Sequence, residues 1–163
     1  MAFRSFRTRL RAFQQMRGDP PDPGFVTDLE FLENRDLDLS VRLGGLLAFD
    51  ALLITIGTHP VSASPGAPLS LDAAIQPLLT LASLAALSPL ALSSWFILKA
   101  MLLGEEFDND ALEGEALRQH LFAAFVRSID AQARLLTLAI RATLAGAGLT
   151  LVVWAVILAG KMV

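Results

Sequence analysis

Residues 73–98, AAIQPLLTLASLAALSPLALSSWFIL, hold no charged side chain between Asp72 and Lys99. At roughly 1.5 Å per residue, a helix of this length crosses a hydrocarbon core about 30 Å thick with residues to spare. Pro89 interrupts the stretch and predicts a kink, because proline cannot donate the backbone hydrogen bond of a regular helix. The stretch therefore predicts a membrane-spanning helix over about residues 73–101.

Two further stretches predict spans on either side of this one. Residues 39–58, LSVRLGGLLAFDALLITIGT, are apolar apart from a few polar residues and end at a loop rich in Pro, Gly and Ser. Residues 142–160 are uncharged between Arg141 and Lys161. Apolar residues make up 54% of the chain, and its charges gather in blocks instead of covering a surface. We predict an all-α, polytopic membrane protein with three transmembrane helices.

The distribution of positive charge predicts the orientation of these helices. Arginines from Arg4 to Arg42 precede the first span, and a further group from Lys99 to Arg141 lies between the second and third. The loop between the first two spans has neither Lys nor Arg, and only Lys161 follows the third. Because Lys and Arg collect on the cytoplasmic side, we expect a bacterial inner membrane protein with its N-terminus inside and its C-terminus outside.

The first 18 residues predict an amphipathic helix at the inner membrane surface. Apolar side chains recur at three- and four-residue spacing, and arginines fall on the opposite face. Residues 1–18 are thus expected to bind the bilayer and its anionic headgroups, although packing against the protein's own cytoplasmic part remains an alternative. The expected membrane anchors are Phe3, Phe6, Leu10 and Phe13. Residues 19–27, which include DPPDPG, form a linker to a membrane domain over residues 28–163.

Long cytoplasmic helical extensions are expected on two of the spans. Thr27 and Glu30 form a capping-box pattern, and no breaker follows, so one helix is expected from about Asp28 to Thr58. A second helix starts near Asp110 and runs into the third span. Its predicted apolar stripe consists of Leu117, Leu121, Phe125, Ile129, Leu136 and Ile140.

Four arginines are candidates for docking on the cytoplasmic side. Three of them recur every seven residues on the second extension and therefore share one helix face. Such a face is either solvated or a docking surface for the acidic segment from Asp28 to Asp38 or for an anionic ligand. The candidates are Arg42, Arg127, Arg134 and Arg141.

Asp50 lies in the middle of the first span and is the candidate functional residue within the membrane. A carboxylate there costs roughly 2.5–3.5 kcal/mol on insertion scales, so something must compensate. A bound proton, hydrogen bonds to hydroxyls of another span, or contact with water in a pore would each do so. The alternative to a functional role is a protonated Asp50 that only joins the helices by hydrogen bonds. The hydroxyls judged to lie at comparable depth belong to Thr80, Ser83, Ser88 and Thr150.

Residues typical of enzymes and cofactor sites are scarce in this sequence. It has no cysteine, and its two histidines, His59 and His120, lack metal-ligand spacing to each other. No glycine-rich phosphate loop occurs, and AGAG over residues 145–148 predicts close helix packing within the third span. We expect a protein that is not an enzyme, with no catalytic residue, metal or cofactor and no nucleic-acid partner.

The order of these elements resembles the transmembrane domain of Pycsar-type antiphage effectors. An acidic helix leads into a span with a basic residue eight positions before an intramembrane acid, here Arg42 and Asp50 in SVRLGGLLAFDALL. A second span, an acidic segment, a helix of the type EALRQHLFAAFVRSIDAQARLLTLAIRATL and a last span follow. The family usually has Lys, often after an acid, where this chain has Ser40-Val41-Arg42. No separate nucleotide-binding domain fits this chain, so nucleotide sensing is not carried over.

This resemblance implies an inner-membrane protein that impairs the membrane when infection is signalled. We therefore expect a non-enzymatic, self-assembling membrane effector of a defence type. One alternative is an accessory subunit of a larger respiratory or photosynthetic membrane complex. Another is a small ion- or proton-coupled transport component built around Asp50. The expected partners are the lipid bilayer and either copies of the chain itself or other membrane subunits.

Overall fold

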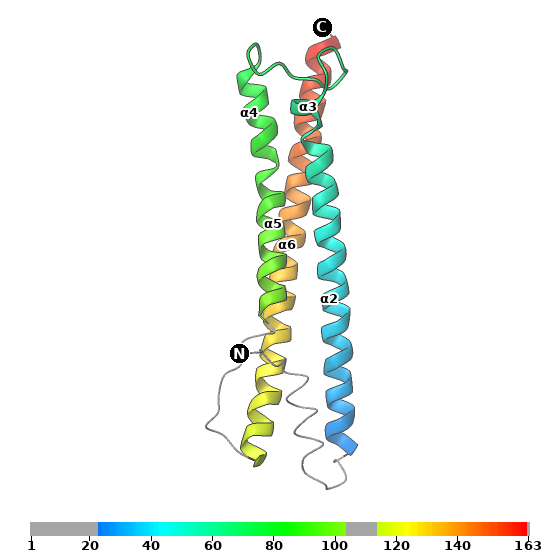
Figure 1. The fold of residues 1–163 in the computed structure, drawn as a ribbon, viewed down its shortest axis with the longest axis vertical. Helices are drawn as coiled ribbons and strands as arrows, with labels where there is room; N and C mark the ends of the chain where they lie inside the picture. The colour runs from blue at the N-terminus through cyan, green and yellow to red at the C-terminus, as the bar shows by residue number, and fades with distance from the viewer. Residues whose placement is uncertain (1–22, 104–113, 163) are drawn as a thin grey trace. The chain divides into compact units, whose positions relative to one another are not determined.

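The computed structural model describes residues 23–103 and 114–162, and every regular element in these ranges is an α-helix (Figure 1). Three stretches are long and apolar enough to cross a membrane: Glu30–Gly57, Pro77–Leu102 and Phe122–Met162. The predicted all-helical class with three helices of membrane-spanning length is therefore confirmed. The predicted surface helix over residues 1–18 lies outside the described residues, as do the first part of the linker and the expected helix start at Asp110.

The first long helix, α2 (Pro23–Gly57), begins before the expected start at Asp28. Proline suits the first turn of a helix, because the backbone N–H that it lacks would have no partner there. The expected capping residue, Thr27, consequently lies inside the helix and not at its end. The expectation that no break separates the acidic segment from the first span is confirmed.

The predicted second span consists of two helices, α4 (Pro77–Ala86) and α5 (Ser88–Leu102), which are separated at Leu87. In an unbroken helix the N–H of residue 89 would bond the carbonyl of Ala85, but Pro89 has no N–H. The hydroxyl of Ser88 donates to that carbonyl at 2.7 Å. Pro89 thus interrupts the span near the position predicted from the sequence.

The chain divides into two compact units whose boundaries fall within the long helices. Unit 1 covers the described residues up to Leu43 together with Leu98–Leu136, and unit 2 covers Gly44–Ile97 and Thr137 onwards. In unit 1, α2 and α6 (Gly114–Met162) each bury an apolar stripe, and the hydroxyl of Ser128 donates to the carbonyl of Leu103 at 3.4 Å. The buried residues of unit 1 are Leu32, Leu39, Leu43, Ala100, Phe125, Ile129, Gln132 and Leu136.

Helix α6 confirms the continuity predicted between the cytoplasmic extension and the third span, because its 49 residues run without a break. Its buried positions alternate in steps of four and three, the spacing of helices packed in a left-handed supercoil. The predicted stripe is therefore wrong at Ile140, which is 43% exposed, while its neighbour Ala139 is fully buried. The buried series runs through Phe125, Ile129, Gln132, Leu136, Ala139, Thr143 and Gly146.

Two glycines set the levels at which the helices of unit 2 meet. A Cβ atom on Gly146 would lie 2.6 Å from Cγ of Leu90 and 3.2 Å from its backbone nitrogen. A Cβ atom on Gly57 would collide with Cδ2 of Leu87 and lie 3.5 Å from Cγ2 of Thr150. Glycine therefore allows α6 to approach α5, and the end of α2 to approach both α6 and the break at Leu87.

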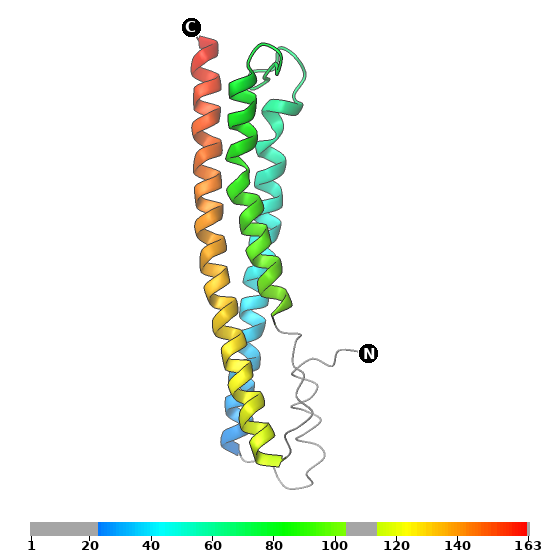
Figure 2. The same ribbon diagram turned by 90° about the vertical axis from the view of Figure 1, so that its left-hand side faces the viewer.

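The segment from Thr58 to Gln76 closes one end of unit 2, here called the loop end, where the C-terminal end of α6 also lies (Figure 2). It includes the short helix α3 (His59–Ser62), and the N–H of Leu71 donates to the carbonyl of Pro60 at 2.8 Å. Lys161 on α6 donates to the carbonyl of Ala67 at 2.8 Å and to Oγ of Ser70 at 3.3 Å. These bonds hold the segment against the end of α6.

We predict that Gly146→Ala destabilises the protein by about 1–3 kcal/mol, the usual cost of an added methyl group in a packed core. The matched change Gly148→Ala, two residues along the same helix, should have little effect, since no atom lies within 4 Å of its Cβ position. Unfolding of the purified variants in mixed micelles would measure both. Equal effects of the two substitutions would contradict the close approach of α6 to Leu90.

Candidate functional site

Asp50, the predicted intramembrane candidate, is completely buried within unit 2. It lies on α2 seven residues before Gly57, and its side chain enters the space between this helix and its neighbours. The hydroxyl of Thr143 on α6 donates to Oδ1 of Asp50 at 2.7 Å. This buried carboxyl is thus bonded to a hydroxyl of another helix, which is one of the three forms of compensation expected from the sequence.

Ser93 on α5 joins this pair to complete a cluster with one residue from each helical stretch of unit 2. Its Oγ lies 2.9 Å from Oγ1 of Thr143, and it is completely buried. A threonine hydroxyl has one hydrogen to donate. With the hydrogen of Thr143 directed to Asp50, Ser93 is the donor to Thr143, and the two bonds form a chain that ends on Oδ1 of Asp50. Asp50, Thr143 and Ser93 are called the core triad below.

The second carboxyl oxygen of Asp50 distinguishes this site from a fully satisfied polar contact. Among the described residues, two buried side-chain polar atoms have no hydrogen-bond partner: Oδ2 of Asp50 and Nε1 of Trp154. Both belong to unit 2. A buried polar atom without a partner typically costs about 1–3 kcal/mol, and more if it is charged, so such atoms call for an explanation.

No other charged group shares the interior of unit 2 with Asp50. The remaining charged or titratable residues of this unit that the structure describes are His59, Asp72, Arg141 and Lys161, and all four are exposed. The core triad therefore contains the one ionisable group buried in the described part of this unit, and it has no countercharge.

The partners proposed for Asp50 from the sequence are wrong. Thr80, Ser88 and Thr150 instead donate to carbonyls of their own helices or helix ends. The fourth candidate, Ser83, is buried but is not the residue that meets Asp50. The prediction placed these four hydroxyls at a depth comparable to that of Asp50. In unit 2, however, α2 stops at the level of Leu87 and Thr150, while α4 and α6 continue past it to the loop end.

The predicted docking arginines differ in their surroundings. Arg42 forms a two-point ion pair with Asp38 one turn earlier on α2, at 3.0 and 2.9 Å, so its charge is engaged within its own helix. Arg127 and Arg134 are exposed on α6 and, within the described part of the chain, form no ion pair with the acidic residues of α2. Arg141 is also exposed, one helical turn before the buried stretch that holds Thr143.

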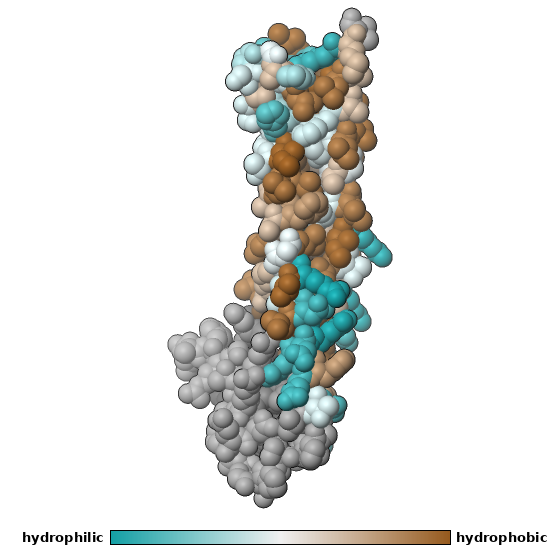
Figure 3. All heavy atoms as spheres, turned by 90° about the vertical axis from the view of Figure 1, so that its right-hand side faces the viewer, coloured by the Kyte–Doolittle hydropathy of each residue, from teal (hydrophilic) through white to brown (hydrophobic). Residues whose placement is uncertain are grey.

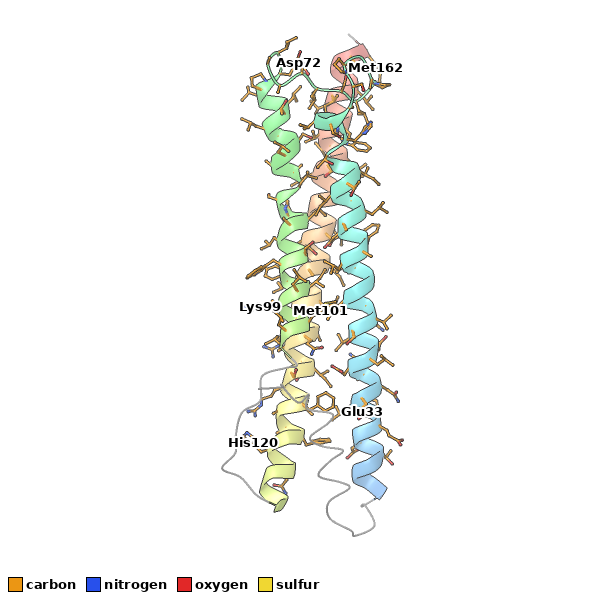
Figure 4. The ribbon with its side chains drawn as sticks, viewed as in Figure 1. Glu33, Asp72, Lys99, Met101, His120 and Met162 are labelled. Carbon is orange, nitrogen blue, oxygen red and sulfur yellow. The ribbon has the colours of Figure 1, made fainter. Side chains whose placement is uncertain are left out.

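A cavity at the loop end of unit 2 is a feature that the sequence analysis missed. It has a volume of about 540 Å³, and its polar lining residues are Ser70, Asp72, Gln76 and Lys161. Asp72 and the neighbour of Lys161, Met162, lie at this end of the molecule (Figure 4). The sequence does not predict this group of polar residues, because Lys161 lies about 90 residues from the loop residues that it contacts.

The described residues contain no group of three or more His, Cys, Asp or Glu side chains that could hold a metal ion. Comparison with known proteins gives no match: no family model fits the chain, and no curated protein or solved structure is significantly similar to it. The chain is thus defined by its own features, three helices suited to crossing a membrane and a buried carboxyl among them. Any functional conclusion has to come from these features.

We predict that Thr143→Val destabilises the protein by more than the roughly 0.6 kcal/mol typical of a hydrogen bond between membrane helices. The change keeps the shape of the side chain but removes the donor to Asp50, leaving both carboxyl oxygens buried without a partner. Thr55→Val is the matched control, since Thr55 is exposed and bonds only Ala51 of its own helix. Unfolding in mixed micelles would compare them, and indistinguishable losses would contradict the importance of the core triad.

Proposed function

We propose that the chain is a non-enzymatic bacterial inner-membrane protein that assembles with copies of itself and makes the membrane permeable, as an effector of a defence type. The observation that carries this proposal is Asp50, a carboxyl buried among three helices of membrane-spanning length with one oxygen unpaired. Ionisable residues within membrane spans are costly and rare, and they occur on pathways for ions or protons. The resemblance to Pycsar-type effectors points to the same kind of activity.

The surface of unit 2 supports its placement within the bilayer. Large apolar side chains are exposed on all three of its helical stretches, among them Leu52, Leu81 and Leu151. On the face drawn in Figure 3, apolar side chains cover much of this unit between its ends. Soluble monomers rarely expose continuous apolar surface of this extent. The placement of arginines favours the N-terminus inside and the loop end outside.

The charges of unit 1 support assembly between copies. Helix α2 exposes Asp28 and Glu30, and hydrophilic side chains gather over this part of the helix (Figure 3). Helix α6 exposes Arg127 and Arg134, and neither forms an ion pair with α2 among the residues that the structure describes. Exposed charges of opposite sign on two helices of one chain match a head-to-tail contact, in which α6 of one copy meets α2 of the next and the contact repeats from copy to copy.

A second function rests on Asp50 as well. A single carboxyl with no countercharge in the described part of unit 2 is also what a small proton-coupled transport component needs, because its charge changes when it takes up or loses a proton. The effector function and the transport function differ in whether membrane permeability depends on the formation of an oligomer. An effector of the proposed kind is silent as a single copy, whereas a transport component acts without forming a large oligomer.

We predict that proteoliposomes containing the wild-type protein leak protons, and that Asp50→Asn reduces the leak while leaving the assembly intact. Asparagine keeps the size of the side chain and its ability to accept from Thr143, but it cannot ionise. A pH-sensitive dye would measure the leak, and mass measurement in mild detergent would measure assembly. If Asp50→Asn leaks as the wild type does while Asp50→Leu fails to assemble, Asp50 only joins the helices and the proposed function loses its basis.

We predict that Arg134→Glu weakens self-assembly and that adding Asp28→Lys and Glu30→Lys partly restores it. Each exposed pair is worth roughly 0–1 kcal/mol, so the effect is expected in the oligomer distribution at low salt, not in folding. Arg35→Glu is the matched control, because it makes the same change in net charge at an exposed site on α2 itself. Equal weakening by the control, or copurification of other proteins in place of copies, would contradict assembly through these faces.

A further inference from the structure

The kind of side chain that lines the interior of unit 2 differs between the two sides of the core triad, the side towards the loop end and the side away from it. The side towards the loop end is lined mainly by small or hydroxyl-bearing residues, whereas the opposite side is closed by apolar ones. One turn beyond Ser93 and Thr143 on that opposite side lie Ile97 and Ala139, both completely buried. We propose that Asp50 binds a proton taken from the loop end alone, through a seam of hydroxyls that leads to it from the cavity there.

The seam begins at the cavity lined by Ser70, Asp72, Gln76 and Lys161. Thr80, buried on α4, donates its hydroxyl to the carbonyl of Gln76 at 3.1 Å. The seam therefore has a polar mouth that is bonded to its first buried residue, and this mouth lies at the end of unit 2 that is outside in the proposed orientation.

The seam continues inward past Ser83 on α4 and Thr150 on α6. Ser83 on α4 is buried and lies ten residues before Ser93 on α5. Trp154 lies eleven residues after Thr143 on α6. Because Ser93 and Thr143 are in contact, Ser83 and Trp154 lie at nearly the same level. Nε1 of Trp154 is the second buried polar atom without a partner in the described residues. Of the two unpartnered polar atoms described in unit 2, one therefore belongs to the inner end of the seam, and the other belongs to a residue at nearly the level of Ser83.

Leu90 forms the narrow point of the seam. It is completely buried against Gly146, at the level between Thr150 and the core triad. The path is therefore closed at this level in the structure, and proton transfer requires the side chain of Leu90 to move. A change of the Leu90 side chain from one staggered rotamer to another is the movement that this step needs.

A proton fits the core triad better than a metal cation does. Hard cations such as calcium and magnesium take six or more oxygen ligands. The side chains of the triad offer four oxygens, and three of these are engaged in hydrogen bonds with one another. A proton needs no volume and one free oxygen, which Oδ2 of Asp50 provides. Binding converts the carboxylate to a neutral carboxyl by forming one O–H bond, and release returns the proton to water at the loop end.

No other titratable group faces Asp50 from the elements packed around it. His59 at the start of α3, Asp72 in the loop, and Arg141 and Lys161 on α6 are all exposed. Helices α4 and α5, up to Ile97, carry no charged residue. Within the described part of unit 2, the group in contact with the carboxyl of Asp50 is therefore a neutral hydroxyl, that of Thr143. This inference rests on the proposed function only in requiring that unit 2 crosses the membrane.

Cysteine accessibility provides the test, since the chain contains no cysteine of its own. Ser83→Cys and Thr150→Cys would be treated with a charged, membrane-impermeant thiosulfonate from either side of oriented vesicles. We expect both to be modified from the loop side only. Ala139→Cys, beyond the triad, should be protected from both sides. Leu151→Cys, which is 65% exposed next to Thr150, should be protected because it faces lipid.

Modification of the seam cysteines from the opposite side, or protection of all four, would overturn the inference. Variants that no longer fold would be recognised by their altered elution in size-exclusion chromatography in mild detergent. A second measurement, made on the wild type, tests the inference even if the cysteine variants fail to fold. The infrared carbonyl band of protonated Asp50 is the band that the wild type shows and Asp50→Asn lacks. The intensity of this band should change with the pH on the loop side alone. A band that follows pH on the other side would also overturn it. If the wild-type protein shows no proton leak while the seam cysteines are still modified from the loop side, only the proposed function is contradicted.

Discussion

The hydrogen bond from Thr143 to Asp50 is the interaction around which unit 2 is organised. A carboxyl placed among membrane helices is tolerated only where the surrounding packing meets at least part of its hydrogen-bonding need. Thr143 does so directly and Ser93 does so through Thr143, and each comes from a different helix. The triad thereby fixes the depth and rotation of three helices with two bonds. Apolar packing in lipid specifies these quantities less strongly, because lipid tails are as apolar as leucine.

Close packing by small residues accommodates that arrangement. Gly146 and Gly57 let the helices approach to the distance at which the side chains of the triad can reach one another, since a methyl group at either position would meet Leu90 or Leu87. The polar bonds and the glycine contacts therefore depend on each other. Bonds of 2.7–2.9 Å across three helices need a short helix separation, and the glycines supply it.

Much of the fold could be predicted from the sequence, and the limits of prediction have physical causes. Runs of apolar residues predict helices of membrane-spanning length because a span must satisfy its own backbone, and Pro89 marked the interruption for the same reason. The partners of Asp50 were not predictable from depth alone. A loop of about 19 residues allows α4 to extend beyond the end of α2, and this offset shifts every level on the neighbouring helix. Ile140 was misplaced because an apolar pattern defines a helix face only to within one residue, and packing at heptad spacing selects Ala139.

The interruption between α4 and α5 has a mechanical consequence. The hydroxyl of Ser88 donates to the carbonyl of Ala85, which Pro89 cannot bond, so this carbonyl keeps a partner at the joint. The stretch from Pro77 to Leu102 is therefore built of two helices that meet at Leu87 and not of one continuous rod. The joint is a packed one, because the side chain of Leu87 fills the space beside Gly57 on α2 and Thr80, Ser83 and Ala86 of α4 are buried. The weakest point in the backbone of this stretch thus coincides with a level at which a neighbouring helix supports it from the side.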